Sequence, residues 1–269
     1  MIICYEYNSK IKLFKKVSKF ATFLKVSFIK FAVSFANRRL VFIIPVAIVE
    51  KALDNLSHVL VDCDYFHVKK LTPSDGHLII DGGAFLGYYT VASSALSNNK
   101  ALVISFEPNT EIVPVLSMNV ELNKARIAKI YPYALCPQSG STNLYVGAYP
   151  AVSSVIREHV ENYTSVEKTI EVRCVKLSSL LSFLSYVDLL KLDIEGLELD
   201  VIREAGRELT RVGGMVVEIH KDIVEPYEVE NIVREHGFDV AVLYTSSEMD
   251  DQAILYAYRS RTPGYLLWR

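Results

Sequence analysis

The amino-acid sequence predicts an α/β fold, with a doubly wound, mostly parallel sheet and an antiparallel hairpin near the end of the chain. From His77 onward, short runs rich in Val, Ile and Leu alternate with stretches of helical period. This alternation is typical of parallel strands that are buried on both faces and linked by helices. Two later strand-like runs, at residues 240–244 and 253–258, are joined by a polar loop, which indicates an antiparallel hairpin.

The predicted elements of the main domain follow in chain order. Strands are expected at residues 78–80, 101–106, 127–133, 189–192 and 215–219, and helices at 88–96, 110–123, 197–209 and 226–236. Two more strands, at 144–146 and 170–175, flank an insertion without a clear helical pattern. We therefore divide the chain into a basic segment at 1–50, a lead-in at 51–76 that ends in the turn sequence TPSDG, and a main domain at 77–269.

The first segment is basic and apolar, with nine basic and no acidic residues between Lys10 and Arg39. At 100° per residue, one stripe collects Leu13, Val17, Phe20, Leu24, Phe28, Phe31 and Phe35, roughly opposite Lys12, Lys15, Lys16, Lys19 and Lys30. This pattern predicts a basic amphipathic helix. Such a helix suits peripheral attachment to a membrane, and it equally suits packing on its own domain or on a second copy in a homodimer.

The four cysteines, at positions 4, 63, 136 and 174, form no CxxC pair and show no zinc-ligand spacing. This favours free thiols in a reducing compartment. No signal-peptide pattern is present, and the longest apolar run, at residues 40–49, is about half of what a bilayer crossing needs. We expect a cytoplasmic protein whose membrane contact, if any, is peripheral at the inner face.

The stretch DGGAFLGYYT, residues 81–90, lies where the first strand meets the first helix. Glycines there allow a sharp turn and a close ligand approach, and the helix N-terminus supplies free N–H groups. The spacing is not GxGxxG, and the preceding Asp81 would repel a pyrophosphate but suit a cationic ligand such as S-adenosylmethionine. Candidate cofactor contacts in this stretch are Asp81, Gly82, Gly83, Ala84, Gly87, Tyr89 and Thr90.

A second acid, Glu107, ends the second strand in FEPN, residues 106–109. An acid at this point can accept hydrogen bonds from both ribose hydroxyls of a nucleoside cofactor. The plain alternative is a helix cap, but Asn109 or Thr110 already suits that role. Glu107, Pro108 and Asn109 therefore join the candidate cofactor contacts.

Five motifs in this order resemble FkbM-type methyltransferases: DGGAFLGYYT, FEPN, MNVELN (118–123), LLKLDIEGLELDVI (189–202) and VVEIH (216–220). The resemblance covers about residues 77–220, and Phe85 stands where Asn is common in the family. It implies a class I, Rossmann-like methyltransferase fold with a seven-stranded sheet whose last strand is antiparallel. It also implies S-adenosylmethionine as cofactor, Ala134 near it, and O-methylation of hydroxyls on sugars and other small metabolites.

Candidate catalytic residues follow the fourth and fifth strands. Lys191, Asp193 and Glu195 alternate along an extended stretch, so they point to one side. Asp193 is expected to orient the acceptor or touch the cofactor, and Lys191 to act catalytically or simply to form an ion pair. His220 is a candidate general base, since imidazole titrates near neutral pH. Glu195 and Glu198 are alternative proton acceptors, and Glu198 also suits the helix N-terminus that follows.

The acceptor side is less defined. Ser153 and Ser154, in the insertion, and Glu198 are candidate substrate contacts. The histidines lack metal-ligand spacing, so we expect no metal, with an Asp193–Glu195–His220 cluster as the less favoured alternative. The main domain lacks a basic patch interleaved with aromatic residues, which argues against nucleic acid as a partner.

The favoured function is thus an S-adenosylmethionine-dependent O-methyltransferase acting on a sugar, a lipid-linked molecule or another small hydroxyl compound. A non-catalytic, membrane-associated scaffold that keeps the fold is one alternative. A nicotinamide-dependent oxidoreductase is another, which Asp81 and the glycine spacing disfavour.

Overall fold

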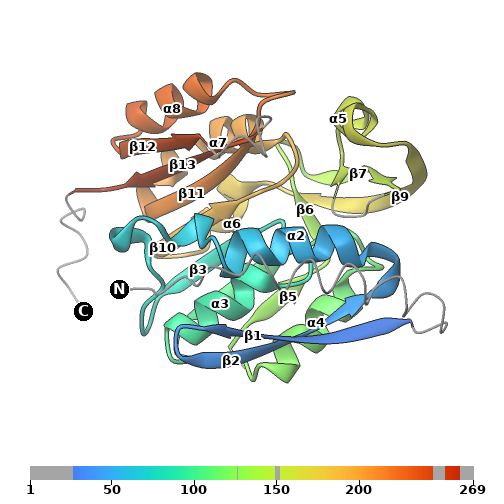
Figure 1. The fold of residues 1–269 in the computed structure, drawn as a ribbon. Coiled ribbons are helices and arrows are strands. Elements are labelled where there is room, and N and C mark those ends of the chain that lie inside the picture. Colours follow the sequence, from blue (N-terminus) through green and yellow to red (C-terminus); the bar gives the residue numbers. More distant parts are fainter. Residues whose placement is uncertain (1–26, 126, 149–151, 245–251, 261–269) are drawn as a thin grey trace.

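A computed structural model describes residues 27–125, 127–148, 152–244 and 252–260 (Figure 1). The central sheet has seven strands in the order β12-β13-β11-β10-β3-β4-β5. β13 runs antiparallel to both of its neighbours, and the other pairs are parallel. The strands are β3 (Leu78–Gly82), β4 (Leu102–Phe106), β5 (Lys129–Tyr131), β10 (Val187–Leu192), β11 (Val212–His220), β12 (Asp239–Tyr244) and β13 (Gln252–Tyr258). The predicted fold class is confirmed.

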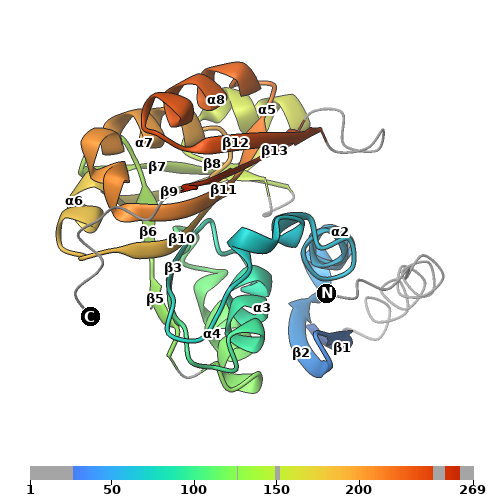
Figure 2. The ribbon, with the colours of Figure 1, turned by 90° about the vertical axis from the view of Figure 1, so that its left-hand side faces the viewer.

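Helices cover both faces of the central sheet (Figure 2). One face carries α2 (Val49–Leu60), α3 (Tyr88–Leu96) and α4 (Val113–Leu122), and the other carries α6 (Leu177–Ser182), α7 (Glu198–Ala205) and α8 (Pro226–Glu235). Successive strand residues enter opposite cores: Ile79 packs in the first and Ile80 in the second. Short 3-10 helices are η1 (Val46–Ile48), η2 (Asp64–Phe66), η3 (Lys69–Leu71) and η4 (Gly206–Arg211). Burial on both faces explains the continuous apolar runs.

The predicted N-terminal helix is wrong over the part of it that the structure describes. Residues 28–45 form an antiparallel hairpin of β1 (Phe28–Phe35) and β2 (Arg38–Pro45). Phe31 and Phe35 are four residues apart, a spacing that places side chains on one face of a helix and also on one face of a strand. Ala36 and Asn37 both have positive φ, 48° and 60°, as a two-residue type I′ hairpin loop requires. The rest of the predicted stripe, residues 1–26, lies outside the described residues.

The hairpin docks on α4 through two asparagines of the MNVELN motif. Asn119 accepts a hydrogen bond from the backbone N–H of Ile43 at 2.6 Å and donates to its carbonyl at 3.2 Å. Asn123 pairs in the same way with Val41, at 2.8 and 2.6 Å. These bonds satisfy backbone groups of β2 that would otherwise lack partners. The hairpin and α2 thus share one hydrophobic core with α3 and α4.

A second sheet carries the insertion. Its strands run in the order β6-β9-β7-β8, and they are β6 (Tyr133–Leu135), β7 (Gly140–Gly147), β8 (Ser153–Ser154) and β9 (Val166–Val175), with α5 (Arg157–Tyr163) after β8. Because β6 and β9 pair in parallel, Cys136 and Cys174 meet and form a disulfide. Cys63 is also disulfide-bonded. The prediction of free thiols is therefore wrong, and the reducing compartment inferred from it loses its basis.

Among the described residues, no helix combines the length and the apolar character needed to span a membrane.

Candidate active site

The glycine turn after β3 contains two positions whose backbone conformation favours glycine. Gly83 has φ +76°, and a Cβ there would lie 1.7 Å from the carbonyl oxygen of Asp193. Gly87 has φ +85°, and a Cβ there would lie 2.5 Å from a side-chain carbon of Leu116. At Gly83 the left-handed backbone and the contact with a backbone oxygen exclude a side chain, whereas at Gly87 the left-handed backbone is the main constraint. Phe85 also has positive φ, 46°, a conformation that Asn tolerates better than Phe.

A buried ion network supports the turn from below. Lys191 donates to the carbonyl oxygens of Gly83 at 2.7 Å and Gly82 at 3.3 Å. Its ammonium also lies 3.4 Å from Asp81 and 3.2 Å from Asp193. Burial raises the pKa of Asp81 against the opposing effect of Lys191, and Thr90 donates to this carboxylate at 2.6 Å. Asp81 and Lys191 are thus positioned to hold the turn, and neither lines the pocket above it.

Glu107 stands at the end of β4 with both carboxylate oxygens engaged. One accepts the N–H of Phe85 at 2.7 Å and the other accepts the N–H of Asn109 at 2.8 Å. Burial raises the pKa of this carboxyl to about 7, although the two N–H bonds act to lower it. Each oxygen retains a second lone pair, so Glu107 can still accept hydrogen bonds from the pocket that it lines.

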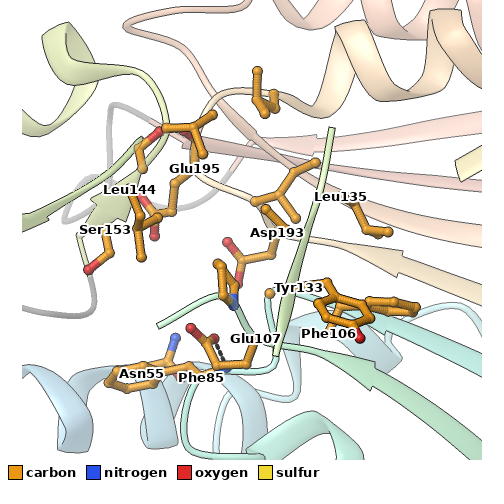
Figure 3. Close-up of a pocket in the computed structure, with 17 residues that line it drawn as sticks. Asn55, Phe85, Phe106, Glu107, Tyr133, Leu135, Leu144, Ser153, Asp193 and Glu195 are labelled. Carbon is orange, nitrogen blue, oxygen red and sulfur yellow. Dashed lines mark hydrogen bonds between the residues drawn. The ribbon is translucent and has the colours of Figure 1, made fainter. Parts of the chain in front are cut away.

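The pocket lies beside the glycine turn, along the edge where β3, β4 and β10 end (Figure 3). It brings together eight of the predicted site residues: Gly83, Glu107, Pro108, Ala134, Ser153, Ser154, Asp193 and Glu195. In Figure 3, Glu107, Phe85 and Asn55 lie on one side of the pocket, with Asp193 and Glu195 across from them. The carboxyl edge of parallel strands is where such sheets bind ligands.

The other predicted residues do not line this pocket: Asp81, Gly82, Ala84, Gly87, Tyr89, Thr90, Asn109, Lys191, Glu198 and His220. Tyr89 instead stacks on Phe66, with ring centroids 5.4 Å apart. Ser154 lines the pocket, but its hydroxyl already donates to the carbonyl of Glu195 at 2.6 Å. This bond ties the insertion to the loop after β10.

Asp193 lines the pocket next to the glycine turn. Its Oδ2 accepts a hydrogen bond from the Tyr65 hydroxyl at 3.1 Å and lies 3.2 Å from the Lys191 ammonium. Its other oxygen lies 4.0 Å from Nε2 of His220. Burial raises the pKa of Asp193 to about 6, with Lys191 opposing the rise.

His220 ends β11 behind the pocket and is buried. Its Nδ1 lies 3.2 Å from Glu198, and Glu198 also accepts the backbone N–H groups of Ile194 and Gly196 at 3.0 and 3.1 Å. Burial lowers the pKa of His220, but Glu195 and Glu198 outweigh it and hold the pKa well above its ordinary value. Glu198 therefore organises the loop and His220, away from the pocket wall.

Sequence reasoning missed the contribution of residues 51–76. The Tyr65 hydroxyl shares its one proton between Asp193 and Glu218, and the carboxylate of Glu218 lies 3.0 Å from Nε2 of His58. The Nδ1 of His58 lies 2.6 Å from Asp64. Burial alone would lower the pKa of His58, but the two carboxylates raise it to about 10. Asn55 of α2 lines the pocket itself. No motif marks these side chains, because their partners are distant in sequence.

Residues 81–240, more than half of the 269-residue chain, match the model of the methyltransferase FkbM domain. The chain belongs to the FkbM methyltransferase family. It is therefore an S-adenosylmethionine-dependent methyltransferase, as the motifs predicted. Gly83 and Glu107 fit this cofactor, because the one leaves room for its close approach and the other has free lone pairs for its hydroxyls. The oxidoreductase alternative is left without support.

Solved structures with a similar fold share little sequence with this chain. A SAM-dependent O-methyltransferase from Thermotoga maritima is 12% identical, with 86% of this chain and 78% of that chain covered and a TM-score of 0.48. Precorrin-6y C5,15-methyltransferase from Geobacter metallireducens is 15% identical, with 75% and 88% covered and a TM-score of 0.47. The Methanococcus jannaschii fibrillarin pre-rRNA processing protein is 11% identical, with 86% and 82% covered and a TM-score of 0.47. These values say nothing of the acceptor. No curated protein matches the chain.

Proposed function

We propose that the protein O-methylates a hydroxyl group of a small molecule, with a sugar or a lipid-linked compound as the substrate class. The observation that supports this is the pair of carboxylates, Asp193 and Glu195, on the pocket wall across from Glu107. A hydroxyl must lose its proton as it is methylated, and a carboxylate within hydrogen-bond reach can orient it and take that proton. Ser153 also lines the pocket.

Different residues of the chain bind the cofactor, orient the acceptor and accept its proton. Gly83 and Glu107 hold the cofactor, which supplies the methyl group when bound and keeps the electron pair of its broken S–C bond on sulfur. Asp193 orients the acceptor hydroxyl and receives its proton. Tyr65 and Lys191, at 3.1 and 3.2 Å, fix the carboxylate of Asp193 in place, so its orientation is set before substrate arrives. His220 lies behind Asp193, so we assign it no direct proton transfer.

The test uses S-adenosylmethionine labelled with ¹³C in the methyl group and a panel of sugars and lipid-linked acceptors. The carbon chemical shift of the product separates O-methyl from N-, S- and C-methyl groups. Asp193→Asn should retain cofactor binding but lose most of the transfer, by roughly 100-fold or more. Transfer to nitrogen or carbon would refute the O-methylation proposal. No transfer to any acceptor by a protein that binds the cofactor would favour the scaffold alternative.

Peripheral membrane contact remains a prediction, since it rests mainly on residues 10–26, which the structure does not describe. Flotation of the full chain with anionic and neutral liposomes tests it. A protein that stays at the bottom of the gradient with both would remove membrane contact from the proposal.

A further inference from the structure

Three side chains from separate parts of the chain bring donor atoms together beside the pocket. His159 comes from α5 in the insertion, Glu195 from the loop after β10, and His220 from the end of β11. Glu195 Oε2 lies 2.7 Å from Nε2 of His159 and 3.5 Å from Nε2 of His220. One donor atom from each lies within 4.8 Å of the other two. Two imidazole nitrogens thus converge on a single carboxylate oxygen.

The Nε2 atom of His220 has no hydrogen-bond partner although it is buried. Its carboxylate neighbours, Glu195 at 3.5 Å and Asp193 at 4.0 Å, are too far for a hydrogen bond. A separation of 3.5 Å does suit two ligands of one ion, because metal bonds of 2.0–2.2 Å in tetrahedral geometry place the ligand atoms roughly 3.4 Å apart. The shorter His159–Glu195 contact would need to open by less than about 1 Å.

The opposite nitrogen of each imidazole faces a further carboxylate. Nδ1 of His159 lies 2.9 Å from Asp222, and Nδ1 of His220 lies 3.2 Å from Glu198. Without an ion, these carboxylates favour protonated imidazoles, and an ion that binds would displace the Nε2 protons. The carboxylates at Nδ1 would then hold the remaining ring proton and leave the Nε2 lone pair for the ion, as they do beside most metal-bound histidines. Asp222 is itself held by Asn162 at 2.9 Å. Both rings are buried, at 0 and 1% exposure, so their orientation is well determined.

We propose that His159, Glu195 and His220 bind one divalent transition-metal ion. Two imidazoles and a carboxylate suit Zn²⁺, Mn²⁺ or Fe²⁺ better than Mg²⁺ or Ca²⁺, which prefer oxygen ligands. Three protein ligands leave a coordination position open. Glu195 and Asp193 line the pocket while neither histidine does, so an ion bound to Glu195 would lie next to the pocket, on the side of these two carboxylates (Figure 3).

An ion there would bind the acceptor oxygen and make its proton easier to remove, with Asp193 beside it to receive the proton. This role rests on the proposed O-methylation, whereas the metal site itself does not. From the sequence we expect no metal, because the histidines lack metal-ligand spacing, and the less favoured cluster of Asp193, Glu195 and His220 does not include His159. The fold brings His159 of α5 to this place, with its ring centroid 5.0 Å from that of His220.

The experiment is calorimetric titration of the chelator-treated full chain with ZnCl₂, without cofactor or acceptor, so that a failed methylation proposal cannot affect the result. Co²⁺ is added in parallel, because its visible spectrum reports the number and geometry of its ligands. His159→Gln, His220→Gln and Glu195→Gln are compared with His77→Gln, a histidine at the opposite end of β3. Asp222→Asn tests the carboxylate behind His159. Circular dichroism checks that each variant is folded.

We expect one equivalent of Zn²⁺ to bind the wild type and the His77→Gln variant alike. Each ligand variant should bind roughly 100-fold more weakly, and Asp222→Asn about 10- to 100-fold more weakly. His159→Gln is the decisive variant, since α5 lies outside the central sheet and its folding should be preserved. No binding by the folded wild type would overturn the proposal. Binding that survives in a folded His159→Gln variant with an unchanged Co²⁺ spectrum would do so as well.

Discussion

Glu107→Gln isolates the contribution of one carboxylate to cofactor binding. Both oxygens of Glu107 accept backbone N–H groups, and their remaining lone pairs are available to the ribose hydroxyls. An amide nitrogen cannot accept, so the variant loses at least one charge-assisted hydrogen bond to the cofactor, worth about 1.5–3 kcal/mol. At 1.4 kcal/mol per tenfold, the affinity should fall about 10- to 150-fold.

The same residue predicts how the affinity depends on pH. Burial raises the pKa of Glu107 to about 7, and the cofactor hydroxyls need the ionised form as acceptor. Affinity should therefore rise with pH up to about 7 and then level off, with a deficit of about tenfold at pH 6. Glu107→Gln, which does not titrate, should lose this dependence.

The assay is calorimetric titration with S-adenosylmethionine and S-adenosylhomocysteine at several pH values from 6 to 8.5. The matched control is Glu111→Gln, since Glu111 lies nearby with its side chain 61% exposed. Ionisation of the ligands themselves affects wild type and variants equally. A wild-type affinity that is flat across this range, or a Glu107→Gln affinity within twofold of the wild type, would refute the assignment of Glu107 to the cofactor.

Three further predictions concern stability and the turn. Gly83→Ala places a Cβ 1.7 Å from the Asp193 carbonyl, so thermal unfolding should show a loss above the 1–2 kcal/mol that left-handed backbone alone costs, and calorimetry should show no cofactor binding. His58→Gln should flatten the pH dependence of denaturant unfolding. The pKa of His58 is raised to about 10, so its contribution to stability, on the order of 5 kcal/mol, is complete below the ordinary pKa of histidine and is lost as pH rises toward 10. Cys136→Ser opens a bridge across 38 residues, and urea unfolding of the non-reduced proteins should show a loss of about 2–4 kcal/mol.

Each of these has an outcome that counts against it. Near-wild-type stability of Gly83→Ala would mean that the turn differs from its described geometry. A wild type that does not lose stability between pH 7 and 10 would contradict a charged His58 between its two carboxylates. For Cys136→Ser, unfolding at the same urea concentration as the wild type would show that the bridge constrains little.

Much of the central sheet was predictable from local pattern. Strands that are buried on both faces have continuous apolar sequences, which makes them recognisable. The helix at residues 88–96 also occurs with the predicted bounds. The candidate cofactor residues could also be predicted from the sequence, because Gly83, Glu107 and Asp193 each directly follow a strand. Strand ends of a parallel sheet meet at one edge, so separate motifs could be assigned to one site before any contact was known.

The N-terminal hairpin shows where local pattern fails. Phe31 and Phe35 satisfy the helical and the strand period alike, and only the docking of β2 on Asn119 and Asn123 of α4 decides between them. The prediction of free thiols fails for a related reason. Nothing in the spacing of Cys136 and Cys174 indicates a bridge, which exists because β6 and β9 are neighbours.

The sequence by itself determined the fold class, the cofactor and the edge of the sheet that carries the candidate site, since these depend on hydrophobic period and on short motifs in contiguous residues. Only the tertiary structure decided which charged groups support the site. His58 reaches Glu218 across 160 positions and His159 reaches Glu195 across 36. Side chains so far apart carry no shared local signal, and their pKa values and ligand geometry arise only when packing removes them from water and brings them together.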